Sequence, residues 1–180
     1  YSKGTISNST SSASVSFTYT GSSSASNIGG LIGYIDASSD NYTISNSSAT
    51  GSVTVSNTSG NVTRVGGFAG TLSGTGTVDR CFSSGTVTSN NGGYVGGFVG
   101  NLYEVDITDS YTVSNISVAA TSSVGGFFSS SPTGAGESSQ PTFTRTYAAG
   151  TITGGSAGGF GGGSNYTNTY TDSFWDTQTT

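Results

Sequence analysis

The side chains that could take part in chemistry are few in this sequence. It has no His, no Met and a single Cys, with four basic and nine acidic residues among 180. Without His, the chain cannot supply an imidazole acid or base, a His-containing catalytic triad or a His-ligated metal site. We therefore expect no catalytic residues, no metal site and no cofactor, and we expect the protein not to be an enzyme.

Two close pairs of carboxylates leave an enzymatic alternative open. Asp36 lies four residues before Asp40, and Glu104 lies two residues before Asp106. Glycoside hydrolysis needs two carboxyl groups about 5–10 Å apart across a cleft. Because the two pairs fall in expected loops of different repeats, a carbohydrate-active enzyme is an alternative hypothesis and not the leading one.

Charged residues of alternating sign recur at one position of a repeated unit. They are Arg80, Asp109, Arg145 and Asp172. If successive units lie on top of one another, these side chains form a ladder of ion pairs. Exposed ion pairs contribute only about 0–1 kcal/mol each, so we expect the ladder mainly to fix the register of neighbouring units.

An aromatic residue follows two positions after each of these charges. This aromatic stripe consists of Phe82, Tyr111, Tyr147 and Phe174. Strand alternation would place the rings on the same side as the charges, where they could stack on sugar rings or on a partner. A bend between the two positions would turn the rings inward instead. Of these two arrangements we expect the buried one.

The elements that must position these residues are internal repeats. The sequence VGGFAG at residues 65–70 returns as VGGFVG at residues 95–100, and looser copies begin at Ile28, Val124 and Ala157. A second repeated unit begins at Ile6, Ile44, Val78, Ile107 and Phe143, with a truncated copy from Tyr170. Fixed units joined by connections of variable length are typical of a solenoid.

The repeated units have the pattern of strands. Thr-Val-Thr and Thr-Ile-Thr alternate polar and apolar residues, and frequent Gly and Ser interrupt any helical period. We predict an all-β fold: a parallel β-solenoid (β-helix) of about five coils with a partial sixth, forming one repeat domain over residues 1–180. The handedness is not assigned.

Equivalent residues of successive coils should form columns that share one interior. The three apolar columns contain Ile6, Ile44, Val78, Ile107, Phe143 and Tyr170; Val15, Val53, Val87, Ile116 and Ile152; and Leu31, Phe68, Phe98, Phe127 and Phe160. We expect the paired glycines before the Phe column to allow a sharp bend or a close approach of two backbones.

The two repeated units together resemble GLUG-motif repeats. Residues 81–87 (CFSSGTV) and 147–152 (YAAGTI) are similar to the first half of that motif, and residues 95–100 (VGGFVG) to the second half. Residues 172–177 (DSFWDT) also look like a segment that often ends such arrays. The resemblance implies a β-solenoid in a large bacterial or archaeal surface protein, often an adhesin, and therefore an extracellular or cell-surface location.

Two kinds of residue could be modified. Cys81 cannot form a disulfide within the chain and occupies a column otherwise made of Ser and Thr, so we expect a small buried residue. An intermolecular disulfide or a reactive thiol is the alternative. Seven candidate N-glycosylation sites occur, at Asn8, Asn41, Asn46, Asn57, Asn61, Asn115 and Asn165.

The two ends of the repeat array suggest self-association. Neither end shows an obvious cap, so the residues either belong to a longer surface protein or stack end to end as a filament. Tyr170, Phe174 and Trp175 are the candidate subunit interface, with Trp175 as an interface anchor or as a plug of the core.

The leading functional hypothesis is thus a non-enzymatic extracellular structural or adhesive module. Surface glycans are possible partners, and ice binding by rows of Thr and Ser is a less favoured alternative. The net charge of −5, with no basic patch, argues against nucleic acid. The apolar runs are too short for membrane insertion by this chain.

Overall fold

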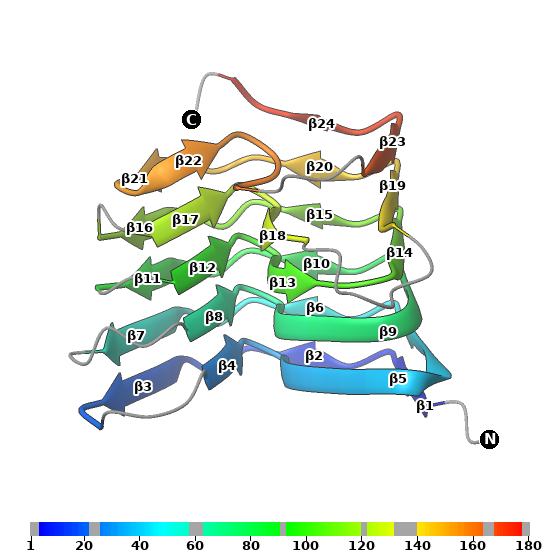
Figure 1. The fold of residues 1–180 in the computed structure, drawn as a ribbon, viewed down its shortest axis with the longest axis horizontal. Helices are drawn as coiled ribbons and strands as arrows, with labels where there is room; N and C mark the ends of the chain where they lie inside the picture. Colours follow the sequence, from blue (N-terminus) through cyan, green and yellow to red (C-terminus); the bar gives the residue numbers. More distant parts are fainter. Residues whose placement is uncertain are drawn as a thin grey trace.

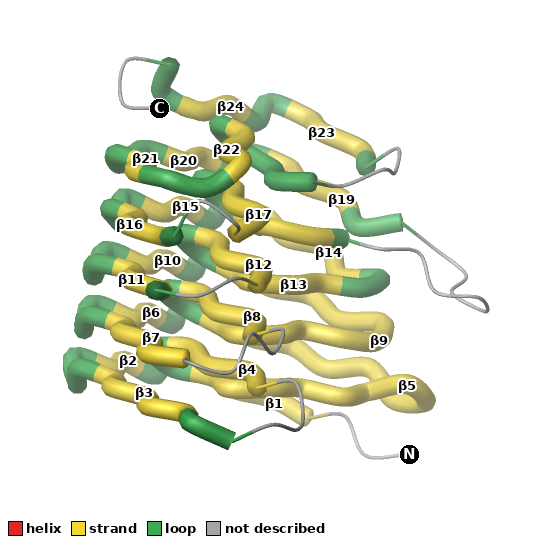
Figure 2. The backbone as a smooth tube through the Cα atoms, turned by 60° about the vertical axis from the view of Figure 1, so that its left-hand side comes forward, coloured by secondary structure: helices red, strands yellow, loops and turns green. Residues whose placement is uncertain are grey.

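The chain is wound into stacked coils of β-strands. The computed structural model describes residues 4–21, 26–57, 63–90, 93–119, 122–131, 140–163 and 168–177. Within these ranges there are strands but no helix, and equivalent strands of neighbouring coils pair in parallel. Figures 1 and 2 show the coils lying one above another, with the two termini at opposite ends of the stack. The predicted parallel β-solenoid is confirmed.

Each complete coil passes through five strand positions. The opening position holds β1 (Gly4–Ser7), the second half of β5 (Ile32–Ser45), the second half of β9 (Ala69–Asp79), β14 (Val105–Thr108), β19 (Thr142–Thr144) and β23 (Thr169–Thr171). The second holds β2 (Thr10–Ser11), β6 (Ser48–Ala49), β10 (Phe82–Ser83), β15 (Tyr111–Thr112), β20 (Tyr147–Ala148) and β24 (Phe174–Trp175).

The remaining three positions complete the circuit. The third holds β3 (Val15–Tyr19), β7 (Val53–Asn57), β11 (Val87–Ser89), β16 (Ile116–Val118) and β21 (Ile152–Thr153). The fourth holds β4 (Ser26–Gly29), β8 (Thr63–Gly66), β12 (Gly93–Gly96), β17 (Ser122–Gly125) and β22 (Ser156–Gly158). The fifth holds the first halves of β5 and β9, then β13 (Val99–Leu102) and β18 (Phe128–Ser130).

The strand register places the predicted columns in line. Ile6 pairs with Ile44, Ile44 with Val78, and so on through Ile107 and Phe143 to Tyr170. In the third sheet, Val53 lies between Val15 and Val87, and the column continues to Ile116 and Ile152. Because the apolar side of most strands in these two sheets faces the inside, their register is fixed by burial as well as by hydrogen bonds.

The interior differs from the single core that the columns suggested. Buried apolar side chains form two separate clusters. The larger contains the opening column and the Phe column, and the smaller contains the Val15 to Ile152 column together with Ile28, Val65, Val95 and Val124. The coil turns at the Gly-Gly unit between these two regions, so one coil has two lobes.

The Phe column is a stack of rings inside the larger cluster. Ring centroids are 4.6 Å apart for Phe68 and Phe98, 4.8 Å for Phe98 and Phe127, and 5.0 Å for Phe127 and Phe160. Phe68, Phe98 and Phe127 have no exposed surface. Burial of each such ring stabilises the fold by about 1.5–3 kcal/mol, so this stack is a main source of stability.

The two glycines before each Phe have different roles, as Gly66 and Gly67 show. A Cβ on Gly66 would lie 2.0 Å from the carbonyl oxygen of Ala69, which belongs to the same bend. A Cβ on Gly67 would lie 2.2 Å from the carbonyl oxygen of Gly97 in the next coil. The predicted sharp bend and the predicted close approach are therefore both present, one at each glycine.

Candidate functional site

The column that carries the predicted ion pairs lies at a corner of the coil. All six of its residues have a left-handed backbone, with φ between 48° and 51°: Asn8, Asn46, Arg80, Asp109, Arg145 and Asp172. Asn and Asp tolerate this conformation better than other residues that have a side chain, which explains four of the six. The corner separates the opening strand from the second strand, and buried and outward residues alternate from the corner onwards, as Asp109, Ser110 and Tyr111 show.

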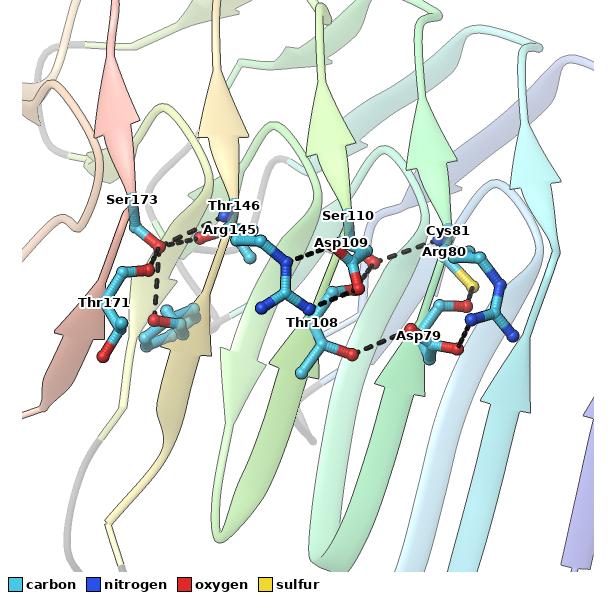
Figure 3. Close-up of polar contacts among 11 residues, drawn as sticks. Asp79, Arg80, Cys81, Thr108, Asp109, Ser110, Arg145, Thr146, Thr171 and Ser173 are labelled. Atoms are coloured by element: carbon cyan, nitrogen blue, oxygen red, sulfur yellow. Dashed lines mark hydrogen bonds and ion pairs between the residues drawn. The ribbon is translucent and has the colours of Figure 1, made fainter.

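The predicted ladder of ion pairs forms at one step and is replaced at another. Arg145 donates from Nε to Oδ1 of Asp109 at 2.6 Å and from Nη2 to Oδ2 at 2.7 Å (Figure 3). Arg80 instead contacts its neighbour Asp79 through Nη1 at 2.7 Å and donates from Nε to Asn46 Oδ1 at 2.8 Å. The expected Arg80 to Asp109 pair is therefore not the contact that Arg80 makes.

The Asp109 and Arg145 pair changes the protonation behaviour of both groups. The hydrogen bond from Arg145 lowers the pKa of Asp109, and the positive charge of the guanidinium adds to the effect. The same hydrogen bond raises the pKa of Arg145, with smaller contributions from the charges of Asp109 and Asp172. Asp172 thus acts on this pair through its charge, one coil further along.

A ladder of hydroxyl groups lies one residue after the corner. In this column Ser110 Oγ donates to Thr108 O at 2.7 Å and accepts the backbone N–H of Cys81 at 3.0 Å. The same pair of bonds is made by Ser47 and by Ser173 with their own neighbours. Each hydroxyl therefore satisfies one carbonyl of its own coil and one N–H of the preceding coil. The sequence showed this column only as small residues.

Cys81 takes the place of a hydroxyl in this ladder. Its Sγ donates to Asp79 O at 3.3 Å, and the backbone N–H of Ser47 bonds to the sulfur. The side chain is 1% exposed, and burial raises the pKa of the thiol to about 11. This burial confirms the prediction of a small buried residue. A protonated and buried thiol is a poor nucleophile, which argues against the alternative of a reactive thiol.

The aromatic stripe faces outward, so the buried arrangement that we expected is wrong. Its neighbours Ser83, Thr112 and Ala148 are the buried residues of the same strands. Tyr111 is 40% exposed and Phe174 is 58% exposed. The rings contact one another in pairs: Phe82 and Tyr111 are stacked, with centroids 5.1 Å apart, and Tyr147 and Phe174 are tilted by 46°, with centroids 4.8 Å apart.

A groove lies between the corner column and the aromatic stripe, across the last three coils. Its volume is about 440 Å³. One side is lined by Asp109, Arg145 and Asp172, the other by Tyr111, Tyr147 and Phe174, and Ser110 and Thr146 lie between them. The structure thus brings together most of the predicted charged column and most of the aromatic stripe in one concave surface.

A second hollow escaped sequence reasoning. It has a volume of about 150 Å³ and is lined by Asn27, Tyr34, Arg64, Thr71 and Tyr103. The Nε of Arg64 is buried there without a hydrogen-bond partner. In the sequence Arg64 stood in no repeated column, because its equivalents Asn27 and Tyr94 are uncharged.

The predicted subunit interface lies in the partial sixth coil. Tyr170 is 49% exposed and Trp175 is 46% exposed, and together with Phe160 they line an apolar hollow of about 470 Å³. The indole of Trp175 lies over Gly159, where a Cβ would be only 2.2 Å from the ring. Trp175 occupies a column that holds Ala49, Ser83, Thr112 and Ala148 in other coils, so a bulky ring covers the end of the stack.

The candidate glycosylation sites differ in their surroundings. Asn8, Asn41, Asn46 and Asn115 are exposed. The amide oxygens of Asn46 and Asn115 already accept hydrogen bonds, from Arg80 and from Thr151 respectively. Asn61 and Asn165 lie outside the described residues, as does the side chain of Asn57.

The acidic pairs of the enzymatic alternative do not meet in the groove. Asp36 is in coil one, opposite Ser73, and the side chain of Asp40 lies outside the described residues. Asp106 accepts a hydrogen bond from Thr142 at 2.5 Å, and Glu104 lies at a left-handed turn before β14. Among the residues that the structure describes, no group of three or more His, Cys, Asp or Glu side chains could hold a metal ion. No helix in the described part of the chain is long and apolar enough to cross a bilayer.

Comparison with known proteins connects this geometry to a repeat family. The GLUG motif model matches residues 61–88, a stretch that contains one Gly-Gly unit and the following corner at Arg80 and ends within β11. Over 97 residues the chain is 35% identical to Halomucin from Haloquadratum walsbyi (strain DSM 16790 / HBSQ001), and the match covers 53% of this chain and 1% of Halomucin. The chain thus spans a very small part of the length of that relative. No solved structure matches. The resemblance to GLUG-motif repeats is confirmed.

Proposed function

We propose that this chain is a non-enzymatic structural and adhesive module of an extracellular surface protein. The observation that carries the proposal is the in-register parallel pairing that runs from β1 through every coil to β23. A stack of this kind is rigid and can be extended by adding coils, because each coil contacts only its neighbours. Its outer faces then repeat at the spacing of the strands.

The comparisons support a surface or adhesin-like protein. GLUG-motif repeats occur in surface proteins. The matched relative is Halomucin, and the match covers only 1% of the length of that protein. A very long chain that contains a stretch similar to this one is compatible with a repeated spacer module. The low content of charged residues, 7% of the chain, also suits a module whose contacts are made by hydroxyl and aromatic groups.

We further propose that the exposed end at β23 and β24 stacks against another coil of the same kind. Among the described strands both are the last in their sheets, so an edge of each could accept a further strand. Tyr170, Phe174 and Trp175 are exposed at this end and would be covered by such a neighbour. The neighbouring coil could belong to the same polypeptide or to a second copy.

Electron microscopy of the purified chain tests the structural role. Filaments of many chains joined along the stack are expected, because a single chain is wider across its coils than it is tall along the stack (Figure 1). A Trp175→Ser variant should form fewer and shorter filaments. Isolated particles without filaments would contradict the proposed end-to-end stacking. Val113→Ser, which changes an exposed apolar residue in coil four and away from both ends of the stack, is the matched control.

An activity assay tests the enzymatic alternative on the same material. Incubation with a panel of polysaccharides should release no reducing ends. Turnover that is lost in Asp36→Asn or Asp106→Asn would overturn the non-enzymatic assignment. Ice binding is supported less, because the outward residues of the third sheet mix Ser and Thr: Ser16, Thr54, Thr88, Ser117 and Thr153.

A further inference from the structure

We propose that the groove between the corner column and the aromatic stripe binds a neutral saccharide chain. The inference rests on the proposed surface role and adds to it a ligand class and a site. Tyr111, Tyr147 and Phe174 would contact the apolar faces of the sugar rings, and Asp109 and Arg145 would bind the hydroxyl groups. The groove of about 440 Å³ is lined by all five of these side chains.

The first reason is the exposed aromatic surface. Tyr111 and Phe174 expose 40% and 58% of their surface, although the same positions in the first two coils are held by the small polar residues Thr10 and Ser48. Packing does not require an aromatic residue at this column, since the outward face is open to solvent. Exposed rings grouped over several coils are therefore more typical of a binding surface than of a core.

The second reason is a polar pair held in a fixed geometry beside these rings. Asp109 and Arg145 are joined by two hydrogen bonds of 2.6 and 2.7 Å, which fix the orientation of the guanidinium and of the carboxylate. The carboxylate oxygens keep further lone pairs, and the guanidinium keeps further N–H donors. A sugar that carries adjacent hydroxyl groups can donate to the one and accept from the other.

The local charge selects among saccharides. Two carboxylates, Asp109 and Asp172, line the groove together with one guanidinium, Arg145. An acidic sugar would meet a net negative surface, in a chain that itself has a net charge of −5. A neutral sugar has no such cost, so the ligand class is a neutral oligosaccharide and not a uronate or a sulfated glycan.

The third reason is the direction of the groove. Its lining residues come from three successive coils, at the corner and two residues after it in each. Equivalent contacts are therefore repeated along the axis of the stack. A ligand made of repeating units can use the same type of contact more than once, which a single monosaccharide cannot.

The test is a binding measurement on the folded chain with defined sugars. Maltotetraose, cellotetraose, mannotetraose and tetragalacturonate would be titrated by calorimetry, after an array of neutral and acidic glycans has been screened. At least one neutral sugar should bind, and Tyr147→Ala and Tyr111→Ala should each weaken that binding roughly tenfold. Tyr147→Phe should retain it within about twofold, because the ring is kept.

The control variant is Tyr34→Ala, since Tyr34 is 52% exposed and does not line the groove. Circular dichroism of every variant confirms that the outward substitutions leave the fold intact. The proposal is overturned if the array shows no binding, if the acidic sugar binds as tightly as the neutral ones, or if Tyr34→Ala weakens binding equally. It is also overturned if Tyr147→Ala alters self-association and no sugar binds.

These outcomes are distinguishable from a failure of the structural role. Filaments seen by electron microscopy together with an empty glycan array would leave the structural module standing and remove the saccharide site. Isolated particles that bind a neutral sugar would do the opposite.

Discussion

At the scale of single residues, the left-handed backbone of the corner costs conformational free energy, and the size of this cost depends on the residue type. Asn8, Asn46, Asp109 and Asp172 belong to the residue types that adopt this backbone most readily, whereas Arg80 and Arg145 do not. The left-handed conformation costs about 1–2 kcal/mol for most residues. The two arginines must therefore be kept by their contacts or by their role at the surface.

Replacement of Arg80 by Asn should stabilise the protein. Arg80 is exposed, and its ion pair with Asp79 is of the kind that contributes about 0–1 kcal/mol. Relief of backbone strain should exceed this loss, giving a gain of about 0.5–1 kcal/mol in the free energy of unfolding. Denaturant titration measures the change. A lower midpoint for Arg80→Asn would show that its contacts to Asn46 and Asp79 outweigh the strain.

Removal of the Arg145 guanidinium should raise the pKa of Asp109. In the native protein the hydrogen bond from Arg145 lowers the pKa of this carboxyl. The pair therefore stabilises the fold at pH values above the ordinary pKa of an aspartate. The contribution is lost as the pH falls through the lowered pKa. NMR titration of the carboxyl carbon in Arg145→Gln should show the pKa moving up towards its ordinary value. No movement would mean that the pair does not persist in solution.

Cys81 offers a test of the hydroxyl ladder. Cys81→Ser should change stability by less than about 1 kcal/mol, because a hydroxyl keeps both hydrogen bonds of the column. Cys81→Val should cost about 1–3 kcal/mol, since the N–H of Ser47 loses its acceptor. Thermal melting of the two variants compares them directly. Equal stability of Ser and Val would contradict a role for these bonds.

The same thiol should make the stability of the protein depend on pH in the alkaline range. Its pKa is raised by burial to about 11, from an ordinary value of about 8.5 in the unfolded chain. The free energy of unfolding should therefore not depend on this thiol below about pH 8.5, and it should fall as the pH rises towards 11, because the unfolded chain loses the proton first. Wild-type protein should lose stability over this range more than Cys81→Ser does.

At the scale of elements, the Gly-Gly bend decides how closely neighbouring coils approach. Gly67→Ala would place a methyl group 2.2 Å from the carbonyl oxygen of Gly97, a distance that only backbone movement can relieve. We expect a loss of more than about 2 kcal/mol, measured by denaturant titration. Gly4→Ala is the control, because its added Cβ meets only Tyr42 at 3.9 Å. Similar losses for both variants would remove the close approach of the two coils as the cause.

Much of the element arrangement could be predicted from the sequence, because repetition converts one local pattern into a stack. The columns through Val53 and Phe98 follow directly from alignment of the copies, and the register confirms them. Strand alternation pointed to the outward side that the aromatic stripe takes, and the expectation of buried rings was wrong because the left-handed corner at Asp109 does not turn the rings inward. The two-lobed interior was hidden for a related reason: the turn direction at Gly66 and Gly67 is a property of backbone geometry.

The candidate groove was predictable only in part. The charges and the rings were both visible as columns in the sequence, but the distance between them depended on the corner. Arg64 was not visible at all, because its equivalents Asn27 and Tyr94 are uncharged. A single departure from a repeated column is a weak signal until a structure shows what surrounds it.

At the scale of the whole molecule, protection against hydrogen exchange should be graded along the stack. Coils two to four contain the fully buried residues Phe68, Phe98 and Phe127 and have a neighbour on each side. Their amides should exchange slowest, whereas β1 and β23 at the two edges should exchange fastest. Native-state hydrogen exchange by NMR measures this. Uniform protection over all coils would indicate a single cooperative unit.

The position of the termini at opposite ends of the stack has a mechanical meaning (Figure 1). When such a stack is pulled from its two ends, the load runs along the direction of the strand-to-strand hydrogen bonds. All rungs then carry the same force in series, and the weakest rung opens first. Each rung that opens releases a length of about thirty residues, as the 29- to 38-residue separations of its bonded partners show. Such a tether would lengthen in steps and absorb sudden force without detaching.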